Sequence, residues 1–441
     1  EPALFEFIKK LTEETKTPFP KKIFLSADVN ASVSYNSSFW SMFLPVRKNL
    51  NIGLGLVNSV NTSEFKAVMA HEFGHFSQRS MKLGSFTYNV NRVIYNMLYN
   101  NNSYNSFLSG WSSVSGYFAF FAAITAGIAN GIRQVLNEMY KFINKSYMGL
   151  SREMEFHADA VAASVSGGNN LITALNRVEV SASCYDTTIN HANSWLKEKK
   201  ITNLFPHHLE IFRSVANDHK LELKEGLPEI SSHFLDSFSR SRVNFKNQWA
   251  SHPTLQERTK HLNELNMNVA PIHQSAWAFF SDAAALQLQL TNIIYGESRS
   301  QEGLTEKQQD YFISWYQKQK ANEALPEVYD GFYNGRILSL KNWDIDFLAA
   351  AKPVKNFENI FSKENAQLQE NIAYNRNDLE TVKNIQSGTL GIKSFDFDGE
   401  KKSIQESDSI IAELDRQINT AIEKQELLQK EAFTFFQQQN P

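Results

Sequence analysis

Apolar side chains at helical spacing dominate the chain, and short β-rich runs occur only near its start, at residues 22–26 and 51–57. Asn61-Thr62-Ser63-Glu64 gives a capping-box-like start to a helix predicted from residue 62 to about residue 80. From about residue 131 the pattern is helical almost to the end, with breaks at prolines. The pattern therefore predicts a helix-dominated α+β fold with one small sheet.

The last part of the chain, residues 351–441, is rich in Gln, Asn, Lys and Glu and carries two apolar seams with the spacing of paired helices. One seam comprises Phe361, Leu368, Ile372, Leu379 and Val382, and the other comprises Ile411, Leu414, Ile418, Ala421, Leu428, Ala432 and Phe435. We expect an antiparallel, coiled-coil-like helical hairpin there, which could bind a partner. It follows a first domain at 1–265 and a helical extension at 266–350.

A short acidic stretch between the two seams raises the question of a calcium loop. If Phe395-Asp396-Phe397-Asp398-Gly399 belonged to a calcium loop, the first position of that loop would be Ser394 and the twelfth would be Gln405. A calcium loop requires an acidic or amide side chain at its first position and a glutamate at its twelfth. Asp398-Gly399 therefore favours a tight turn in the segment between the two helices.

Charge and cysteine usage narrow the chemistry. With 44 basic and 47 acidic side chains and a pI near 6.5, the bulk charge does not indicate a nucleic-acid partner. The single cysteine excludes an intrachain disulfide and a zinc–thiolate cluster. Any metal must therefore be bound by histidines and carboxylates.

The candidate chemistry lies in His71-Glu72-Phe73-Gly74-His75, which is H-E-x-x-H on a predicted helix. The i, i+4 spacing directs both imidazoles to one face, where they can bind one ion. Glu72 would then lie beside the metal and take a proton from the attacking water. The alternative is a helix with two ordinary surface histidines.

A second helical element, residues 151–159, offers the third ligand that a catalytic zinc requires. Glu155 and Asp159 share one face with small residues that permit close approach of the first helix. Glu155 can bind the metal, while Asp159 orients a bound histidine through its other ring nitrogen. Glu153 and His157 form a rival pair, which we expect to be a plain helical contact.

These two elements, together with Asn30-Ala31 upstream and Ser251-His252-Pro253 and Arg258 downstream, resemble the HtpX-like and CAAX prenyl protease family of zinc peptidases. The resemblance covers residues 1–265. It implies a gluzincin endopeptidase with a small zincin-type sheet and one zinc ion, which hydrolyses protein or peptide substrates in membrane-linked quality control.

The downstream and upstream elements receive roles through this resemblance. Asn30 and Ala31 would lie on a sheet edge, expected within residues 27–35, along which substrate binds; an ordinary internal strand is the alternative. His252, just before a helix capped by Thr254 and Glu257, could stabilise the oxyanion or contact the metal site. Arg258 would help to bind substrate. Alternatively, His252 and Arg258 only fix that helix to the domain.

The chain departs from a compact gluzincin in the long interval between His75 and Glu155. Residues 93–132 contain no charged side chain, and the apolar part at 117–132 is only about 24 Å long as a helix, short of a bilayer core of about 30 Å. A buried or membrane-dipping hairpin therefore fits better than a membrane span. We expect a partly exposed apolar element beside the active-site mouth that can contact a membrane or an unfolded substrate, with the catalytic domain in a soluble compartment. A simple core helix is the alternative.

A function from another class also fits the sequence, namely a zinc-stabilised chaperone-like or protein-binding module that recruits partners through the helical tail. Glu72 favours catalysis, because a purely structural metal site does not need a base.

Overall fold

The computed structural model describes residues 1–34, 48–77, 87, 90–91, 93–95, 116–238, 241–244, 252–296, 298, 303–336, 356–389, 392 and 394–439. The described chain divides into two units. The first comprises residues 1–235 and 248–313, and the second comprises 236–247 and 314–441. The chain therefore enters the second unit briefly, returns to the first, and enters the second again.

The sheet of the first unit has the strand order β1-β3-β2, with β1 (Ile23–Ser26) parallel and β2 (Ala31–Ser34) antiparallel to β3 (Asn49–Gly53). The edge strand expected within residues 27–35 is therefore β2, which pairs on one side only among the described strands. The predicted run at 51–57 is a strand only as far as Gly53. Its remainder is the helical turn α2 (Leu54–Val57), whose four residues are all buried.

Helix α3 (Thr62–Ser77) carries the H-E-x-x-H motif, and its start is the predicted capping box. The Asn61 side chain accepts a hydrogen bond from Glu64 N at 2.9 Å, and the Glu64 carboxylate accepts one from Asn61 N at 3.0 Å. Apolar side chains of α3, including Phe65, Met69 and Phe73, lie in the main core together with the sheet and α1 (Pro2–Glu14). This packing determines which face of α3 points towards the helix that carries Glu155.

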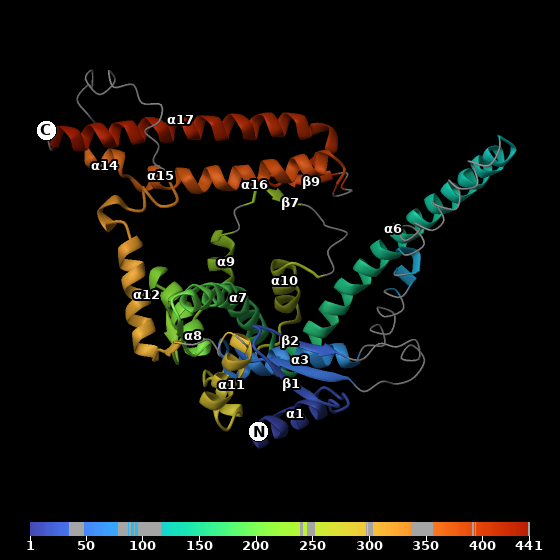
Figure 1. Cartoon of the computed structure of the whole chain (residues 1–441), viewed down its shortest axis with the longest axis horizontal. Coiled ribbons are helices and arrows are strands. Elements are labelled where there is room, and N and C mark those ends of the chain that lie inside the picture. Colours follow the sequence, from blue (N-terminus) through green and yellow to red (C-terminus); the bar gives the residue numbers. More distant parts are fainter. Residues whose placement is uncertain are drawn as a thin grey trace. The chain divides into compact units, whose positions relative to one another are not determined.

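The remaining helices of the first unit surround this centre (Figure 1). They are α6 (Gly116–Ser166), α7 (Gly168–Lys197), α8 (Leu204–Asp218), α10 (Leu255–Leu265), η2 (Ala276–Phe279) and α11 (Ala283–Tyr295). Two short strand pairs, β4 (Lys200–Ile201) with β8 (Thr305–Glu306) and β5 (Leu223–Lys224) with β6 (Leu227–Pro228), complete it. Helices α9 (Ser232–Phe238) and α12 (Gln309–Glu323) each run from one unit into the other.

The described side chains in the first half of α6 are not buried in a hydrophobic core. Among its described side chains, none before Glu155 is fully buried. Seven large apolar side chains are exposed, namely Phe120, Ile124, Ile128, Ile132, Val135, Met139 and Phe142. The simple core helix considered from the sequence is therefore wrong for the described part of residues 117–132. The predicted exposed apolar element is found, although residues 96–115 lie outside the described chain. Among the described helices, none meets the length and hydropathy needed to cross a membrane.

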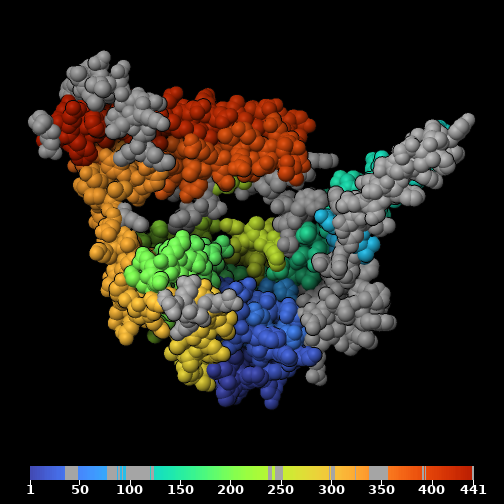
Figure 2. All heavy atoms as spheres, viewed as in Figure 1, coloured from blue at the N-terminus to red at the C-terminus, as the bar shows by residue number. Residues whose placement is uncertain are grey.

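The second unit is built on α16 (Leu368–Gln386) and α17 (Ser407–Gln439), which lie along each other (Figures 1 and 2). The hairpin of β9 (Ser394–Phe397) and β10 (Glu400–Ser403) reverses the chain between them, and β7 (Val243–Asn244) adds a third strand. The expected turn at Asp398-Gly399 is confirmed, since both residues have positive φ and the ladder closes across them. Short elements η4 (Glu327–Tyr329), α14 (Phe357–Ile360), α15 (Lys363–Ala366) and η5 (Ile404–Glu406) flank the two helices.

Candidate metal centre

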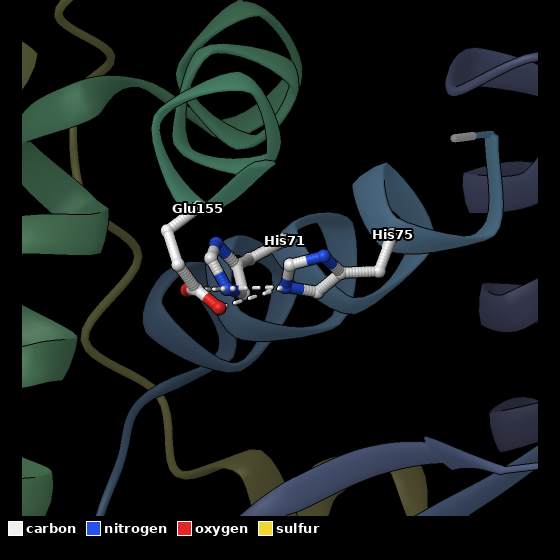
Figure 3. A group of neighbouring side chains, drawn as sticks. All are labelled: His71, His75 and Glu155. Atoms are coloured by element: carbon white, nitrogen blue, oxygen red, sulfur yellow. Dashed lines mark hydrogen bonds and ion pairs between the residues drawn. The ribbon is translucent and has the colours of Figure 1, made fainter. Parts of the chain in front are cut away.

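Helix α3 presents His71 and His75 one turn apart, with their ring nitrogens turned towards each other (Figure 3). The two Nε2 atoms are 3.2 Å apart. His71 is buried and His75 nearly so, with side chains 10% and 17% exposed. The i, i+4 spacing of the motif therefore brings two imidazole nitrogens to one point.

Helix α6 supplies a carboxylate to the same point (Figure 3). Glu155 Oε2 lies 3.3 Å from His71 Nε2, and Glu155 Oε1 lies 3.6 Å from His75 Nε2. These three residues are the group in the described chain that could hold a metal ion. Ligand atoms at about 2.1 Å from one tetrahedral ion lie about 3.4 Å from one another, so these separations, each taken to the nearer Glu155 oxygen, are of the size that a zinc ion requires.

Close approach of α3 and α6 depends on a glycine inside the motif. A Cβ placed on Gly74 would lie 2.7 Å from Ala158 Cα, closer than such atoms can approach, and 3.1 Å from Ala158 Cβ, a tight contact. Ala158 and Ala162 are both fully buried on α6. The predicted role of small residues on this face is therefore confirmed at Ala158, one turn from the Glu155 carboxylate.

The other ring nitrogen of His71 faces Asp159 and Arg258. Asp159 Oδ1 lies 2.9 Å from His71 Nδ1 and accepts its hydrogen, so Nε2 is the nitrogen that faces Glu155 and His75 and would bind a metal ion. Arg258 donates two hydrogen bonds to Asp159, at 2.9 and 2.5 Å, and its Nη2 lies 3.3 Å from His71 Nδ1. Asp159 is fully buried, so the guanidinium supplies the charge that such a carboxylate requires.

The charges of this cluster favour a cation at its centre. Burial acts to lower the pKa of His71, but hydrogen bonds to Asp159 and Glu155 raise it to about 9. Burial acts to raise the pKa of Glu155, yet the neighbouring histidines and Arg258 lower it to about 2. The pKa of Asp159 is also below its usual value, because its hydrogen bonds to His71 and Arg258 outweigh burial. The raised pKa of His71 and the lowered pKa values of Glu155 and Asp159 show that negative charge is held at this point. The same negative charge would stabilise a metal ion bound there.

Glu72 lies on α3 beside this cluster, and its carboxylate accepts a hydrogen bond from the backbone N–H of Val33 on the edge strand β2. Burial, more than the nearby charges, raises the pKa of Glu72 to about 7. The helix and the sheet edge thus meet at the carboxylate that the motif assigns to proton transfer.

The remaining candidates from the sequence are placed as follows. His252 Nδ1 lies 3.0 Å from Glu155 Oε1, and its side chain is 69% exposed. Asn30 is exposed just before β2, and Ala31 is the first residue of that strand. Glu153 is exposed and lies outside the metal-binding group, as does His157. The structure therefore gathers His252 with the centre, leaves Glu153 out, and places Arg258 behind His71, where Asp159 binds its guanidinium.

Two contacts of the site could not be read from the sequence. Lys48 Nζ donates hydrogen bonds to the carbonyl oxygens of His75 and Phe76, at 3.1 and 2.9 Å, and so caps the end of the described part of α3. Burial lowers the pKa of Lys48 to about 8. The hydrogen bond from Val33 N to Glu72 is the second such contact. Both arise from the packing of the sheet against α3, for which no motif exists.

An H-E-x-x-H helix and a carboxylate from a second helix, converging on one point, define the centre of a metallopeptidase. Residues 3–266 match the model of Peptidase family M48. The match covers more than half of the 441 residues, so the chain belongs to peptidase family M48, and the resemblance inferred from the sequence is confirmed.

Individual relatives agree with this assignment. The chain is 30% identical over 138 residues to Protease HtpX of Vibrio vulnificus, across 30% of this chain and 43% of that protein. It is 26% identical over 185 residues to Protease HtpX of Glaesserella parasuis, across 40% of this chain and 58% of that protein. The chain thus spans about half the length of the curated relatives it matches. In the comparison with solved structures, none matches the chain.

Proposed function

We propose that this protein is a zinc-dependent endopeptidase in which His71, His75 and Glu155 bind one zinc ion and Glu72 is the general base. The observation that supports this most directly is the convergence of three residues from two helices: the two histidine Nε2 atoms are 3.2 Å apart, and each lies 3.3–3.6 Å from one of the two Glu155 oxygens. This spacing suits a single tetrahedral ion with one open position. Such an open position distinguishes a catalytic site from a structural one.

A bound zinc ion would lower the pKa of a water molecule and polarise the peptide carbonyl. The residues of the chain supply the rest. Glu72 accepts a proton from the water and passes it to the departing amine. Asp159, held by Arg258, keeps the hydrogen of His71 on Nδ1, so Arg258 acts through Asp159 rather than on substrate.

Substrate contacts follow from the edge strand and from His252. An extended peptide could pair with β2 (Ala31–Ser34), whose start at Asn30 and Ala31 adjoins the Val33–Glu72 hydrogen bond. His252 is exposed and close to Glu155, so its ring can donate a hydrogen bond to the oxygen that becomes negative in the transition state. The substrates would be unfolded or extended protein segments.

Association with a membrane is part of the proposal. The seven exposed apolar side chains on α6, from Phe120 to Phe142, lie within one sector of about 120° of the helix circumference, at about 100° per residue. Basic Lys141 and Lys145 are exposed on the same helix. A face of this kind can lie in the headgroup region of a bilayer. A membrane-linked role in protein quality control would fit it.

The competing function is a zinc-stabilised, chaperone-like binding module without turnover. It accounts for the metal-binding group and the helical second unit, but it gives no role to a carboxylate held between α3 and the sheet edge. The hydrogen bond from Val33 to Glu72 therefore favours catalysis.

The test is incubation with an unfolded casein-type substrate, with and without a chelator. We expect chelator-sensitive cleavage that added zinc restores. Glu72→Gln should keep one zinc per chain, because Glu72 is not a ligand, and lose about 10²- to 10⁴-fold in rate. A Glu72→Gln protein that cleaves at the wild-type rate would contradict the mechanism, while substrate binding without any cleavage would favour the binding module.

A further inference from the structure

Residues 241–244 contact the rest of the second unit as a bound peptide would. Val243 and Asn244 pair antiparallel with Phe397 and Asp396 of β9, on the side away from β10. The backbone N–H of Asp398 donates a hydrogen bond to the carbonyl of Arg242 at 3.0 Å. The segment thus extends the β9–β10 hairpin by one short strand, which is how many peptides bind to proteins.

The Arg242 side chain contacts an acidic surface of the second unit. Its Nε and Nη2 donate to the two oxygens of Asp398 at 2.8 and 2.5 Å, and Nη1 donates to Gln417 at 2.7 Å. Glu413 lies 3.4 Å from Nη2. The guanidinium also lies over the Phe397 ring, 4.5 Å from its centroid. A planar, bidentate and stacked arrangement of this kind selects arginine over lysine.

Two further contacts bind the neighbouring residues. Asp378 on α16 is fully buried and accepts hydrogen bonds from the Ser241 hydroxyl at 2.7 Å and from Arg242 N at 3.1 Å. Val243 is 5% exposed and belongs to an apolar cluster with Val382, Phe395, Phe397 and Leu414. The segment is therefore recognised at a hydroxyl, a guanidinium and a β-branched apolar side chain in succession.

We propose that this surface of the second unit, formed by Asp378, Phe397, Asp398, Glu413 and Gln417, is a binding site for extended peptides of another protein that contain serine, arginine and a β-branched apolar residue in that order. Residues 241–244 occupy it in cis. We call it the arginine-peptide site. It is separate from the metal centre, and its test does not depend on peptidase activity.

Exchange of the cis segment is energetically feasible. The Asp398 side chain is 50% exposed and Arg242 is 26% exposed, so solvent screens their ion pair. Only two residues pair with β9. The covalent link gives the cis segment an effective concentration in the millimolar range, which favours it over most free peptides until it is weakened.

The first experiment uses the full chain and a fluorescent peptide with the sequence of residues 238–246. Arg242→Ala should release the cis segment, so this protein should bind the peptide at least tenfold more tightly than the wild type does. Adding Asp398→Lys should abolish binding, whereas Asp415→Lys, on another face of α17, should not. A peptide with glutamate in place of the arginine at position 242 should not bind. If the wild type and all variants bind the peptide equally weakly, the proposal is wrong.

A second measurement uses the wild type alone and applies even if Arg242→Ala fails to fold. Amide hydrogens of residues 242–244 should exchange at least tenfold faster than that of Leu414 in the core of α17, because the segment can detach while the helices stay folded. Exchange of both at one rate would show that the segment leaves only on global unfolding. The site would then be a fixed part of the fold, and the proposal would be wrong.

Discussion

The ring of His71 is contacted on both nitrogens by charged groups, and this determines how the proposed ligand is presented. Asp159 and Arg258 lie at Nδ1, while Glu155 and His75 lie at Nε2. The choice of Glu155 followed from its i, i+4 relation to Asp159 on a predicted helix. The link from Arg258 to Asp159 joins residues 99 positions apart, and no local pattern reports such a contact.

Removal of Glu155 should distinguish the two carboxylates considered for the metal. Glu155→Ala takes away one of three ligand atoms and also leaves His71 and His75 without their counter-charge, so we expect at least a hundredfold weaker zinc affinity. Glu153→Ala changes an exposed side chain on the same helix and should leave zinc affinity within about twofold. Competition with a chromophoric chelator measures both affinities. Loss of zinc from the Glu153 variant alone would exclude the proposed ligand set.

At the scale of elements, the contact between α3 and α6 controls the distance between the histidines and Glu155. Gly74→Ala places a methyl group against the backbone of Ala158, and the helices must move apart. We expect a loss of about 1–3 kcal/mol in the free energy of unfolding and weaker zinc binding. Urea unfolding and chelator competition measure the two effects.

A matched control is available on the exposed half of α6. A Cβ at Gly127 meets no atom within 4 Å, so Gly127→Ala should stabilise the helix by about 0.5–1 kcal/mol. Opposite signs for the two substitutions would show that the cost at Gly74 comes from the interhelical contact. If both stabilise the protein, α3 and α6 can separate without penalty, and the description of the contact is wrong.

A buried polar network joins α7, α8 and Asn58 at the end of α2. His208 Nε2 donates to the carbonyl of Ser181 at 2.9 Å, and its Nδ1 accepts from Asn58 Nδ2 at 3.2 Å. Asn58 cannot turn its amide round, because Trp277 Nε1 donates to its oxygen at 3.1 Å. A proton on His208 Nδ1 would face a donor, so the folded protein requires the neutral ring.

This network predicts a pH dependence of stability. Burial lowers the pKa of His208 from 6.5 to about 4, so the unfolded chain binds the proton more tightly and stability falls as pH decreases from 6.5 towards 4. His208→Gln removes this effect. The stability difference between wild type and variant should therefore shrink by about 2 kcal/mol between pH 7.5 and pH 5, measured by urea unfolding. A constant difference would mean that His208 has the same pKa in the folded protein as in the unfolded chain.

The elements could be predicted from the sequence where a pattern specifies them locally. The capping boxes at Asn61 and Thr254 and the turn at Asp398-Gly399 lie as expected, because each depends on residues within four positions. The predicted end of β3 at Val57 was wrong, and the strand ends at Gly53. Four consecutive buried residues suit a strand or a buried helical turn equally well, so the pattern could not distinguish the two. The polar network of His208 depends on four distant segments and gave no signal.

At the scale of the whole chain, the sequence pattern did not predict how the chain passes between the two units. The prolines and the shift in composition at residue 351 suggested boundaries at 265 and 350, which remain predictions. They gave no hint that residues 236–247 belong with the C-terminal helices. Strand β7 has only two residues, too few for a recognisable pattern. Its partner β9 lies about 150 residues further along the chain, so no local signal reports their pairing.

The exposed apolar row on α6 leads to the last prediction, which follows from the proposed membrane association. An isolated apolar side chain on a surface needs no explanation, but seven within one sector of a helix do. Each large apolar side chain that enters a bilayer interface contributes about 1.5–3 kcal/mol, so the wild type should float with liposomes that contain anionic lipid. Ile128 is 61% exposed, and Ile128→Asp should reduce flotation at least tenfold without lowering the melting temperature. Asn130→Asp, an exposed position about 140° from the centre of the row, should change flotation little. If Ile128→Asp unfolds the protein, or the wild type does not float, the row is covered by protein and the membrane link fails.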